Sequence, residues 1–364
     1  MKALVCSEHG LADKLNLVDD WSTSELGEHD VRIQVKAASL NFPDVLIIQG
    51  KYQFQPELPF VPGGESSGIV TEVGEKVTRV KVGDSVVAMG TIGSFCAEVV
   101  TNEFGVYPMP DGLDFTQAAS IGITYFTSYH ALKQRANLQS GETMLVLGAA
   151  GGVGTSAVEL GKLMGAKVIA AASSEEKLEV CRSLGADETI NYGETDLKLA
   201  IKELTDGKGV DVVYDPIGGD YSEAAIRGMA WNGRYLVIGF ASGPIPKIPL
   251  NLALLKGCSL VGVFWGRFCG EEPAQHVKNI EELWALFSEG KIKPVITDIY
   301  PIERYEEALK AFEGTLADLT YRTPAKALNS KGYTLYIMGR HEEAIKALSN
   351  AVRRVPKLCP ARFH

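Results

Sequence analysis

The sequence predicts an α/β protein: a small β domain followed by a doubly wound parallel sheet, with a helical hairpin at the C-terminal end. Three observations support this prediction. The 364 residues exceed what one hydrophobic core usually supports. Short β-rich runs broken by Gly and Pro fill the first third of the chain, and apolar strands then alternate with helical stretches. We therefore expect domains at residues 1–122 and 123–290, and a hairpin at 325–364.

The first domain is predicted from strands that alternate apolar and polar residues. The pattern is clearest at residues 31–35 and 68–74, and it indicates a small barrel or sandwich. A return segment, residues 291–324, is expected to rejoin this domain. Within it we predict a strand at 293–300 and a helix over about 301–313.

The second domain is predicted from apolar runs of five or six residues that show no alternation. Such runs are typical of a parallel sheet whose two faces are both covered by helices. The strands are expected at residues 143–147, 167–171, 210–214 and 234–238.

The end of the chain carries one unit of about 34 residues that resembles a tetratricopeptide repeat. Its signature positions are Leu328, Gly332, Leu335, Gly339, Ala344, Leu348, Ala351 and Pro356. A lone repeat cannot bury its own apolar face. The hairpin is therefore expected to dock elsewhere on the chain, to bind another protein, or to remain loose.

Charge and composition narrow the function classes. The formal net charge of −9 repels nucleic acid and anionic lipid, so a small-molecule enzyme is the default expectation. The six cysteines are scattered with no C-x-x-C pair, which indicates reduced thiols. The sequence shows no signal-peptide core and no apolar stretch of about 18 residues. It predicts a cytoplasmic protein without membrane contact, and leaves a mitochondrial location open.

The strongest chemical signal is a strand, a glycine turn and a helix in that order. The turn is Gly148-Ala149-Ala150-Gly151-Gly152-Val153-Gly154. Glycines let a pyrophosphate approach the backbone, and the following helix offers it N–H donors. The pattern predicts a Rossmann-type dinucleotide site contacted by Ala149, Gly151, Gly152, Val153 and Gly154, although Ala149 replaces the first glycine of the usual fingerprint. The other interpretation is a purely structural turn.

The end of the second strand distinguishes NADPH from NADH. An acidic residue there would bind the ribose hydroxyl of NADH and would repel the extra phosphate of NADPH. This chain instead has Ser173, with Lys177 one turn later and Tyr192 beyond it, so NADPH is the predicted cofactor. In the alternative interpretation Lys177 is a solvated helix residue beside Glu175 and Glu176.

Several ordered motifs carry a family resemblance that covers residues 1–313. They include Ser-Leu-Asn-Phe-Pro-Asp at 39–44, Gly-Gly-Glu at 63–65, Tyr-Phe-Thr-Ser-Tyr at 125–129 and Asp-Pro-Ile-Gly-Gly at 215–219. With the glycine turn behind a β domain, the chain resembles the zinc-free quinone oxidoreductase (zeta-crystallin-like) branch of the medium-chain dehydrogenase/reductase superfamily. The resemblance implies a GroES-like first domain and hydride transfer from NADPH to a quinone or enone. It also implies a homodimer or homotetramer built on the Rossmann domain.

The resemblance further implies that no zinc takes part. Zinc-dependent relatives have Cys and His ligands at the positions of Asn41 and Gly64, and neither residue is a usual zinc ligand. Their structural lobe with four cysteines is missing here as well. His9, His29 and His130 are scattered, and we expect them on the surface or satisfied in the core. Without a Lewis acid, reduction of an electron-poor acceptor is the more feasible reaction.

Three polar residues are candidates for stabilising or protonating the acceptor oxygen: Asn41, Tyr52 and Thr127. By resemblance, Asn41 and Thr127 line the nicotinamide cleft, and Tyr52 lies in a loop that borders it. Each has a structural alternative, with Asn41 capping a turn, Tyr52 a packed ring and Thr127 a helix cap. Asp44 is expected only to hold the loop.

Two further segments, Ile238-Gly239-Phe240 and Val263-Phe264-Trp265, are expected at the ends of neighbouring strands. Their backbone groups are predicted to bind the nicotinamide carboxamide, while Phe264 and Trp265 form a wall of the pocket. Alternatively, these aromatic side chains belong to the core or to a dimer interface.

The chain departs from the family after Glu313, where the expected closing strand is missing. Two other hypotheses therefore stay open. One is a non-catalytic NADPH-binding scaffold that recruits protein partners through its hairpin. The other is a reductase of enoyl-CoA thioesters, with Lys247, Lys256 and Arg267 contributing to a basic entrance for the CoA phosphates.

Overall fold

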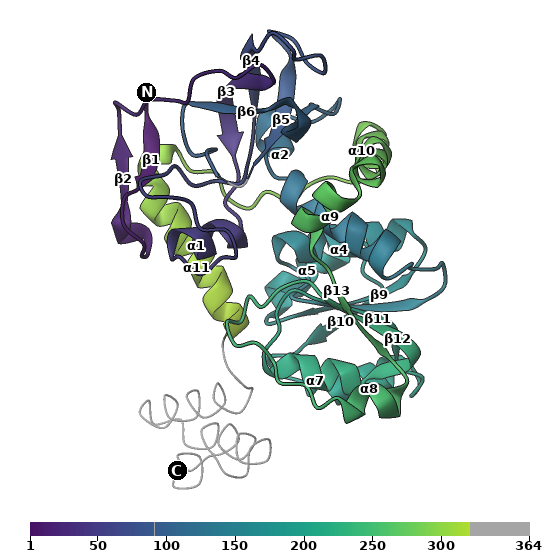
Figure 1. Ribbon diagram of the computed structural model, residues 1–364. Coiled ribbons are helices and arrows are strands. Elements are labelled where there is room, and N and C mark those ends of the chain that lie inside the picture. Colours follow the sequence, from purple (N-terminus) through teal and green to yellow (C-terminus); the bar gives the residue numbers. More distant parts are fainter. Residues whose placement is uncertain (91, 321–364) are drawn as a thin grey trace, which may run out of the picture. The chain divides into compact units, whose positions relative to one another are not determined.

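The computed structural model describes residues 1–90 and 92–320, which form two compact units (Figure 1). The first unit combines Met1–His130 with Phe264–Gly314, and the second contains Ala131–Val263. Residues 264–290, which the sequence assigned to the second domain, group with the first unit. The hairpin predicted at 325–364 lies outside the described residues.

The first unit is built on an antiparallel five-stranded sheet in the order β6-β3-β4-β5-β7, accompanied by the hairpin β1-β2. The strands are β1 (Ala3–Cys6), β2 (Leu15–Val18), β3 (Asp30–Ala38), β4 (Glu65–Val73), β5 (Ser85–Met89), β6 (Glu98–Asn102) and β7 (Val106–Pro108). Val31 and Ile33 of β3 are fully buried while Arg32 and Gln34 are not, as the alternating pattern predicts. Both predicted strands of this domain are confirmed.

Short helices complete the first unit. They are α1 (Phe42–Ile48), α2 (Phe115–Ala118), the π-helical turn η3 (Gly122–Phe126), α3 (Thr127–His130), α9 (Trp265–Glu271), α10 (Pro273–Ser288) and α11 (Tyr305–Thr320). Aromatic packing and hydrogen bonds hold α10 in this unit. The indole of Trp284 donates to the Pro108 carbonyl at 2.6 Å, and the Tyr129 hydroxyl donates to Glu282 at 2.5 Å. These contacts explain why residues 264–290 do not belong to the second unit.

The strand predicted at 293–300 is wrong. The backbone there is extended but belongs to no sheet of the described chain. Alternation alone cannot make a strand, because each strand needs a neighbour for its N–H and C=O groups. Helix α11 begins at Tyr305, and it runs to Thr320 rather than ending near Glu313. Leu309 of α11 is buried in an apolar cluster with Leu4 and Leu15.

The second unit contains a parallel six-stranded sheet in the order β10-β9-β8-β11-β12-β13. Its strands are β8 (Thr143–Leu147), β9 (Lys167–Ala172), β10 (Glu188–Asn191), β11 (Val210–Asp215), β12 (Met229–Val237) and β13 (Ser259–Gly262). Helices α4 (Gly152–Leu163) and α5 (Glu175–Ser183) lie on one face, and α7 (Asp220–Arg227) and α8 (Asn251–Lys256) lie on the other (Figure 1). This is the doubly wound order, which confirms the predicted fold class. The fourth predicted strand begins earlier than expected, at Met229.

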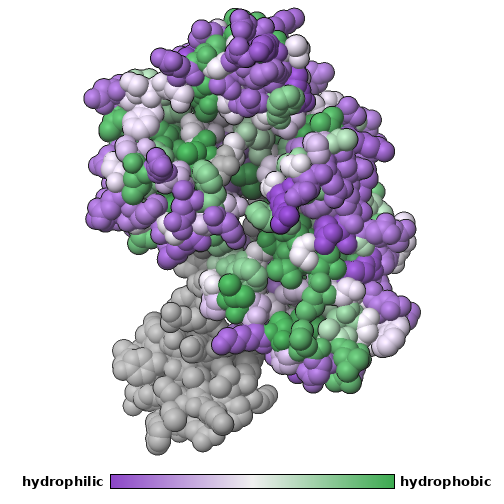
Figure 2. Space-filling view, viewed as in Figure 1, coloured by the Kyte–Doolittle hydropathy of each residue, from purple (hydrophilic) through white to green (hydrophobic). Residues whose placement is uncertain are grey.

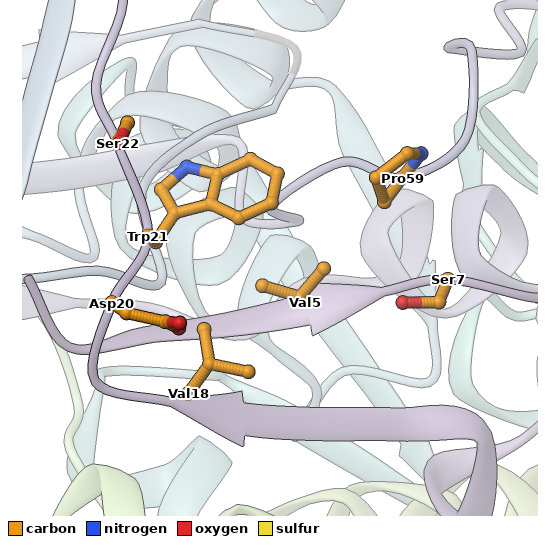
Figure 3. Close-up of a pocket in the computed structure, with 7 residues that line it drawn as sticks. All are labelled: Val5, Ser7, Val18, Asp20, Trp21, Ser22 and Pro59. Carbon is orange, nitrogen blue, oxygen red and sulfur yellow. The ribbon is translucent and has the colours of Figure 1, made fainter.

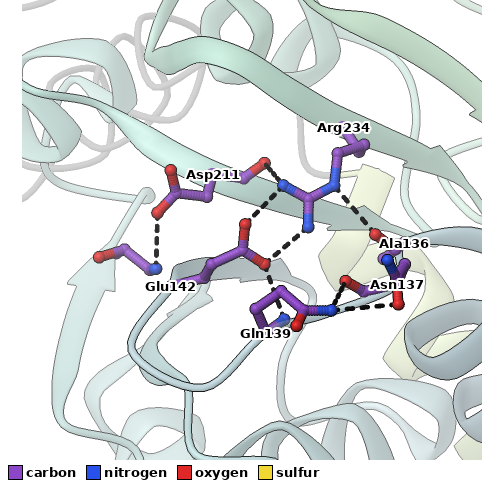
Figure 4. A network of polar contacts seen from close by, with 7 residues as sticks. Ala136, Asn137, Gln139, Glu142, Asp211 and Arg234 are labelled. Carbon is purple, nitrogen blue, oxygen red and sulfur yellow. Dashed lines mark hydrogen bonds and ion pairs between the residues drawn. The ribbon is translucent and has the colours of Figure 1, made fainter.

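A polar network fixes the amino ends of the strands in the second unit (Figure 4). Both guanidinium Nη atoms of Arg234 donate to the Glu142 carboxylate, at 2.8 and 2.6 Å. The Asp211 carboxylate accepts from the Thr143 amide at 2.8 Å. The Arg234–Glu142 pair therefore ties β12 to the segment that enters β8, at the end of the sheet opposite the glycine turn.

Apolar side chains gather on the surface of the second unit over α8 (Figure 2). The most exposed residues in and beside this helix are Trp231, Leu250, Leu254 and Leu255. We call this set the α8 patch. Contiguous exposed apolar surface of this kind is typical of interaction sites. None of the helices at residues 1–90 and 92–320 is long and apolar enough to cross a membrane.

Candidate functional site

The glycine turn at the carboxyl end of β8 has the geometry of a phosphate cradle. Gly148 adopts a left-handed φ of 57°, and the Gly151 amide donates to the Gly148 carbonyl at 2.9 Å. A Cβ on Gly154 would lie 2.3 Å from the Gly148 carbonyl oxygen, so only glycine lets α4 pack this close to the strand. Ala149 is fully buried, and its amide donates to Ala171 of β9 at 3.0 Å.

The position of this turn fits a dinucleotide. Strand β8 lies between β9 and β11, where the strand order reverses, and α4 begins at Gly152 directly after the turn. The first amides of a helix have no acceptor within the helix and point at whatever lies before its N-terminus. Gly151, Gly152, Val153 and Gly154 would hold a pyrophosphate there.

The end of β9 brings a hydroxyl and a cation together. The Lys177 ammonium group donates to the Ser173 hydroxyl at 3.1 Å, and Ser174 caps α5 by accepting from the Lys177 amide at 3.4 Å. Lys177 is half-buried, whereas its neighbours Glu175 and Glu176 are exposed. This arrangement suits a phosphate on a ribose held by the preceding turn.

Tyr192, the third residue predicted at this phosphate, is a core residue. Only 2% of it is exposed, and its ring packs against Tyr221 with the centroids 4.5 Å apart. We therefore keep Ser173 and Lys177 alone for the phosphate contact.

The segment at Ile238-Gly239-Phe240 is anchored to a buried carboxylate that appears in a family motif but was given no role from the sequence. Asp215, at the end of β11, accepts hydrogen bonds from the Ile217 and Gly218 amides, each at 2.8 Å, and from the Tyr235 hydroxyl. Its backbone carbonyl accepts from the Ile238 amide at 3.0 Å. Asp215 thus fixes two loops at the carboxyl ends of β11 and β12. In the sequence, the only sign of this role is an acidic residue at the end of an apolar strand.

The segment Val263-Phe264-Trp265 is divided between the two units. The Val263 amide donates to the Val237 carbonyl at 3.0 Å, which extends the second unit beyond β13. In the first unit, Phe264 is 54% exposed. The ring centroids of Trp265 and Phe126 are 5.9 Å apart, in an aromatic cluster. Trp265 packs in this cluster but is only half-buried.

Asn41 of the first unit is held by its neighbours. Its side-chain Nδ2 donates to the Ser39 hydroxyl at 2.7 Å and to the Glu65 carboxylate at 2.8 Å. Both amide hydrogens are therefore engaged within the protein, and Asn41 has none to offer to a ligand. This geometry favours the structural role for Asn41 over the donor role.

Two buried carboxyl groups flank Asn41, and the sequence analysis gave them no chemical role. Glu65 is fully buried and also accepts from the Ser39 hydroxyl at 2.5 Å and from the Ile123 amide at 3.0 Å. Asp44 is 2% exposed and accepts from the Asn41 amide at 2.7 Å. Burial raises the pKa of Asp44 to about 7 and also raises that of Glu65. The only sequence signal was the three-residue spacing of Asn41 and Asp44, which is typical of a capping box.

Tyr52 and Thr127 are the two candidates whose hydroxyl groups remain available. Both residues are half-buried, and neither hydroxyl makes a hydrogen bond within the described parts of the chain. Burial raises the pKa of Tyr52, and the nearby charge of Asp44 raises it further. Thr127 is the first residue of α3, just after the η3 turn whose Ile123 amide contacts Glu65.

No set of three His, Cys, Asp or Glu side chains that could hold a metal ion occurs among the described residues. At Gly64, a Cβ would lie 3.6 Å from Asp44 Oδ1 and 3.1 Å from Ile123 Cδ1. The five cysteines within the same part of the chain form no disulfide.

An open groove lies elsewhere on the first unit (Figure 3). It is lined by Val5, Ser7, Val18, Asp20, Trp21, Ser22 and Pro59. None of the predicted site residues lines it, and its lining contains one carboxylate and no cation. It is therefore not part of the candidate site.

Comparison with known proteins gives counterparts for both units. Residues 27–140 match the alcohol dehydrogenase GroES-like domain family, and residues 152–288 match the zinc-binding dehydrogenase family. A quinone oxidoreductase-like protein 2 homolog of Nematostella vectensis is 42% identical over 312 residues, covering 85% of each protein. Escherichia coli quinone oxidoreductase complexed with NADPH has a TM-score of 0.81 at 28% identity, covering 86% of this chain and 97% of that one. The CurK enoyl reductase has a TM-score of 0.78 at 27% identity, covering 86% and 96%.

Proposed function

Because the chain belongs to the quinone oxidoreductase branch of the medium-chain dehydrogenase/reductase superfamily, we propose that it transfers hydride from NADPH to a quinone or an enone without zinc. The observation that carries this proposal is the glycine turn at the reversal point of the sheet, with Ser173 and Lys177 at the end of the next strand. NADPH supplies the hydride when it is bound. The protein supplies orientation and electrostatics.

The preference for NADPH is proposed from the charges at the end of β9. The end of β9 carries no carboxylate that would repel the ribose phosphate, and Lys177 offers a cation beside the Ser173 hydroxyl. The Escherichia coli relative was solved with NADPH. We propose that Ile238, Gly239, Phe240 and Val263 bind the nicotinamide end through backbone groups, with Phe264 as an exposed wall.

Zinc independence is supported by the residues around Asn41. Neither Asn41 nor Gly64 offers a usual zinc ligand, and the nearby Glu65 carboxylate is already surrounded by three hydrogen-bond donors. Negative charge on the acceptor would therefore be stabilised by hydrogen bonds. We assign that part to Tyr52 and Thr127, and one well-oriented donor contributes about 3 kcal/mol. Asn41 acts as a positioning residue in this scheme.

The test is NADPH oxidation by the full chain with 9,10-phenanthrenequinone, 1,4-benzoquinone and simple enones. NADH in place of NADPH and added EDTA are the controls. We expect turnover that prefers NADPH and is unchanged by the chelator. Binding of NADPH without turnover of any acceptor would contradict the proposal and favour the non-catalytic scaffold.

The phosphate contact predicts a selective effect of Lys177→Glu. We expect the Kd of NADPH to rise roughly tenfold to a hundredfold, because a charge-assisted hydrogen bond to phosphate is lost and a repulsion is gained. The Kd of NADH should change little. Isothermal titration of both cofactors measures this, with Lys198→Glu as the control for the same charge change at an exposed helix position. Equal weakening of NADPH and NADH would contradict the contact.

The enoyl-CoA hypothesis is the second candidate, and the likeness to the CurK enoyl reductase favours it. The structure adds little support for the predicted basic entrance. Lys247 and Lys256 lie in the second unit, whereas Arg267 lies in the first and pairs with Glu271 at 3.2 Å. Turnover of a short enoyl-CoA well above that of the simple enones would select this reaction.

A further inference from the structure

We propose that Asp44 and Glu65 form a buried carboxyl pair that holds a single proton, and that this proton resides on Asp44. Both residues belong to the first unit, so the pair can be tested without cofactor or acceptor.

The two carboxyl groups meet at one residue. The backbone amide of Asn41 donates to Asp44 Oδ2 at 2.7 Å, and the side-chain amide of Asn41 donates to Glu65 Oε1 at 2.8 Å. Asp44 is 2% exposed and Glu65 is not exposed at all. Two anions that share Asn41 as a donor and are this deeply buried repel each other, so the pair is more stable with one proton.

The donors around the pair decide which group keeps the proton. Glu65 Oε1 accepts from the Ser39 hydroxyl and from Asn41, and Oε2 accepts from the Ile123 amide. These donors stabilise its anion. The Asp44 carboxyl group accepts one hydrogen bond of normal geometry, at Oδ2, and its Oδ1 accepts none of normal geometry within the described residues. A buried oxygen without a donor is costly as part of an anion, so the proton resides on Asp44.

The charges that face Asp44 agree with this assignment. Burial is the largest influence and raises the pKa of Asp44 to about 7, and the charge of Glu65 raises it as well. The amides of Asn41, Gly63 and Gly64 act in the opposite direction. Together these effects leave Asp44 protonated below neutral pH and ionised above it.

The pair is tested by infrared spectroscopy of the full chain without ligands. We expect the carbonyl band of a protonated carboxyl group to disappear with a midpoint near about pH 7, and to be absent in Asp44→Asn. Asp114→Asn is the matched control, since Asp114 is an exposed helix cap. Glu65→Gln removes the neighbouring charge that raises the pKa of Asp44, so it should move the midpoint to lower pH, and it serves if Asp44→Asn fails to fold. A band that persists in Asp44→Asn, no titration near neutral pH, or an unmoved midpoint in Glu65→Gln would overturn the pair.

Discussion

At the scale of single residues, the candidate site depends on polar groups that the protein satisfies internally. Asn41 gives its amide hydrogens to Ser39 and Glu65, and Asp215 collects donors from two loops. Buried polar groups with full sets of partners are rigid, so they fix the surrounding backbone. Tyr52 and Thr127 differ from them because their hydroxyl groups stay available for a ligand.

The buried Asp44 carboxyl predicts a dependence of stability on pH. Its pKa of about 7 in the folded state lies above the value of about 3.9 in an unfolded chain. The stability that the bound proton contributes is complete below about pH 4 and is lost as the pH rises through about 7. We therefore expect Asp44→Asn to gain stability relative to the unsubstituted chain over that window, on the order of a few kcal/mol. Thermal unfolding at a series of pH values measures this, and a pH-independent difference would contradict it.

At the scale of elements, helix α4 and the turn before it pack so closely that they tolerate few substitutions. The missing side chain of Gly154 allows the first turn of α4 to approach the Gly148 carbonyl. The strand before the turn is anchored separately, through Glu142 and Arg234 at its other end. Substitutions at the two ends of β8 should therefore have different consequences.

Gly154→Ala should weaken cofactor binding. The added Cβ would lie 2.3 Å from the Gly148 carbonyl oxygen, so the turn has to shift. We expect the Kd of NADPH to rise by roughly tenfold or more, in line with the loss of a phosphate hydrogen bond. The matched control is Gly270→Ala in α9, where a Cβ meets nothing within 4 Å. An unchanged Kd in Gly154→Ala would show that the turn does not bind the cofactor.

Arg234→Met should lower stability without changing NADPH affinity. The Arg234 and Glu142 side chains are only 20% and 22% exposed, so removing one leaves a poorly solvated partner, at a cost of about 1–3 kcal/mol. Arg227→Met is the control, because the Arg227–Glu223 pair is 43% and 42% exposed and should contribute under about 1 kcal/mol. Urea unfolding measures both variants. Equal losses would contradict the role of burial.

At the scale of the whole molecule, the α8 patch is the surface on which we propose that copies of the chain associate. Leu254 is 78% exposed and Leu250 is 77% exposed, beside Trp231 at 71%. Covering such side chains is favourable at about 25 cal/mol per Å² of apolar surface.

Leu254→Glu should therefore shift the protein from a dimer or tetramer towards a monomer. Light scattering coupled to size-exclusion chromatography measures the mass. Leu199→Glu is the control, because Leu199 is 63% exposed on α6 (Leu197–Leu204) and lies outside the patch. A protein that is monomeric before substitution would rule out this surface as the interface.

The sequence by itself determined the features that depend on neighbours along the chain. Alternation predicted two strands of the first sheet, and continuous apolar runs predicted four strands of the second. The glycine spacing predicted the turn before α4, because these patterns reflect local backbone geometry. The ordered motifs by themselves also indicate the superfamily. The sequence likewise shows Ser173, and not an acidic residue, directly after β9.

Only the tertiary structure decided which groups meet across long separations. Asn41 and Glu65 are 24 residues apart, and Glu65 and Ile123 are 58 apart, so no local pattern could reveal that Asn41 has no hydrogen left for a ligand. The segment at 293–300 has a strand-like sequence but no neighbouring strand, and α10 groups with the first unit through aromatic contacts. Burial and hydrogen-bond partners are properties of the folded chain, and they alone distinguish a polar residue that holds the site from one that is free to act in it.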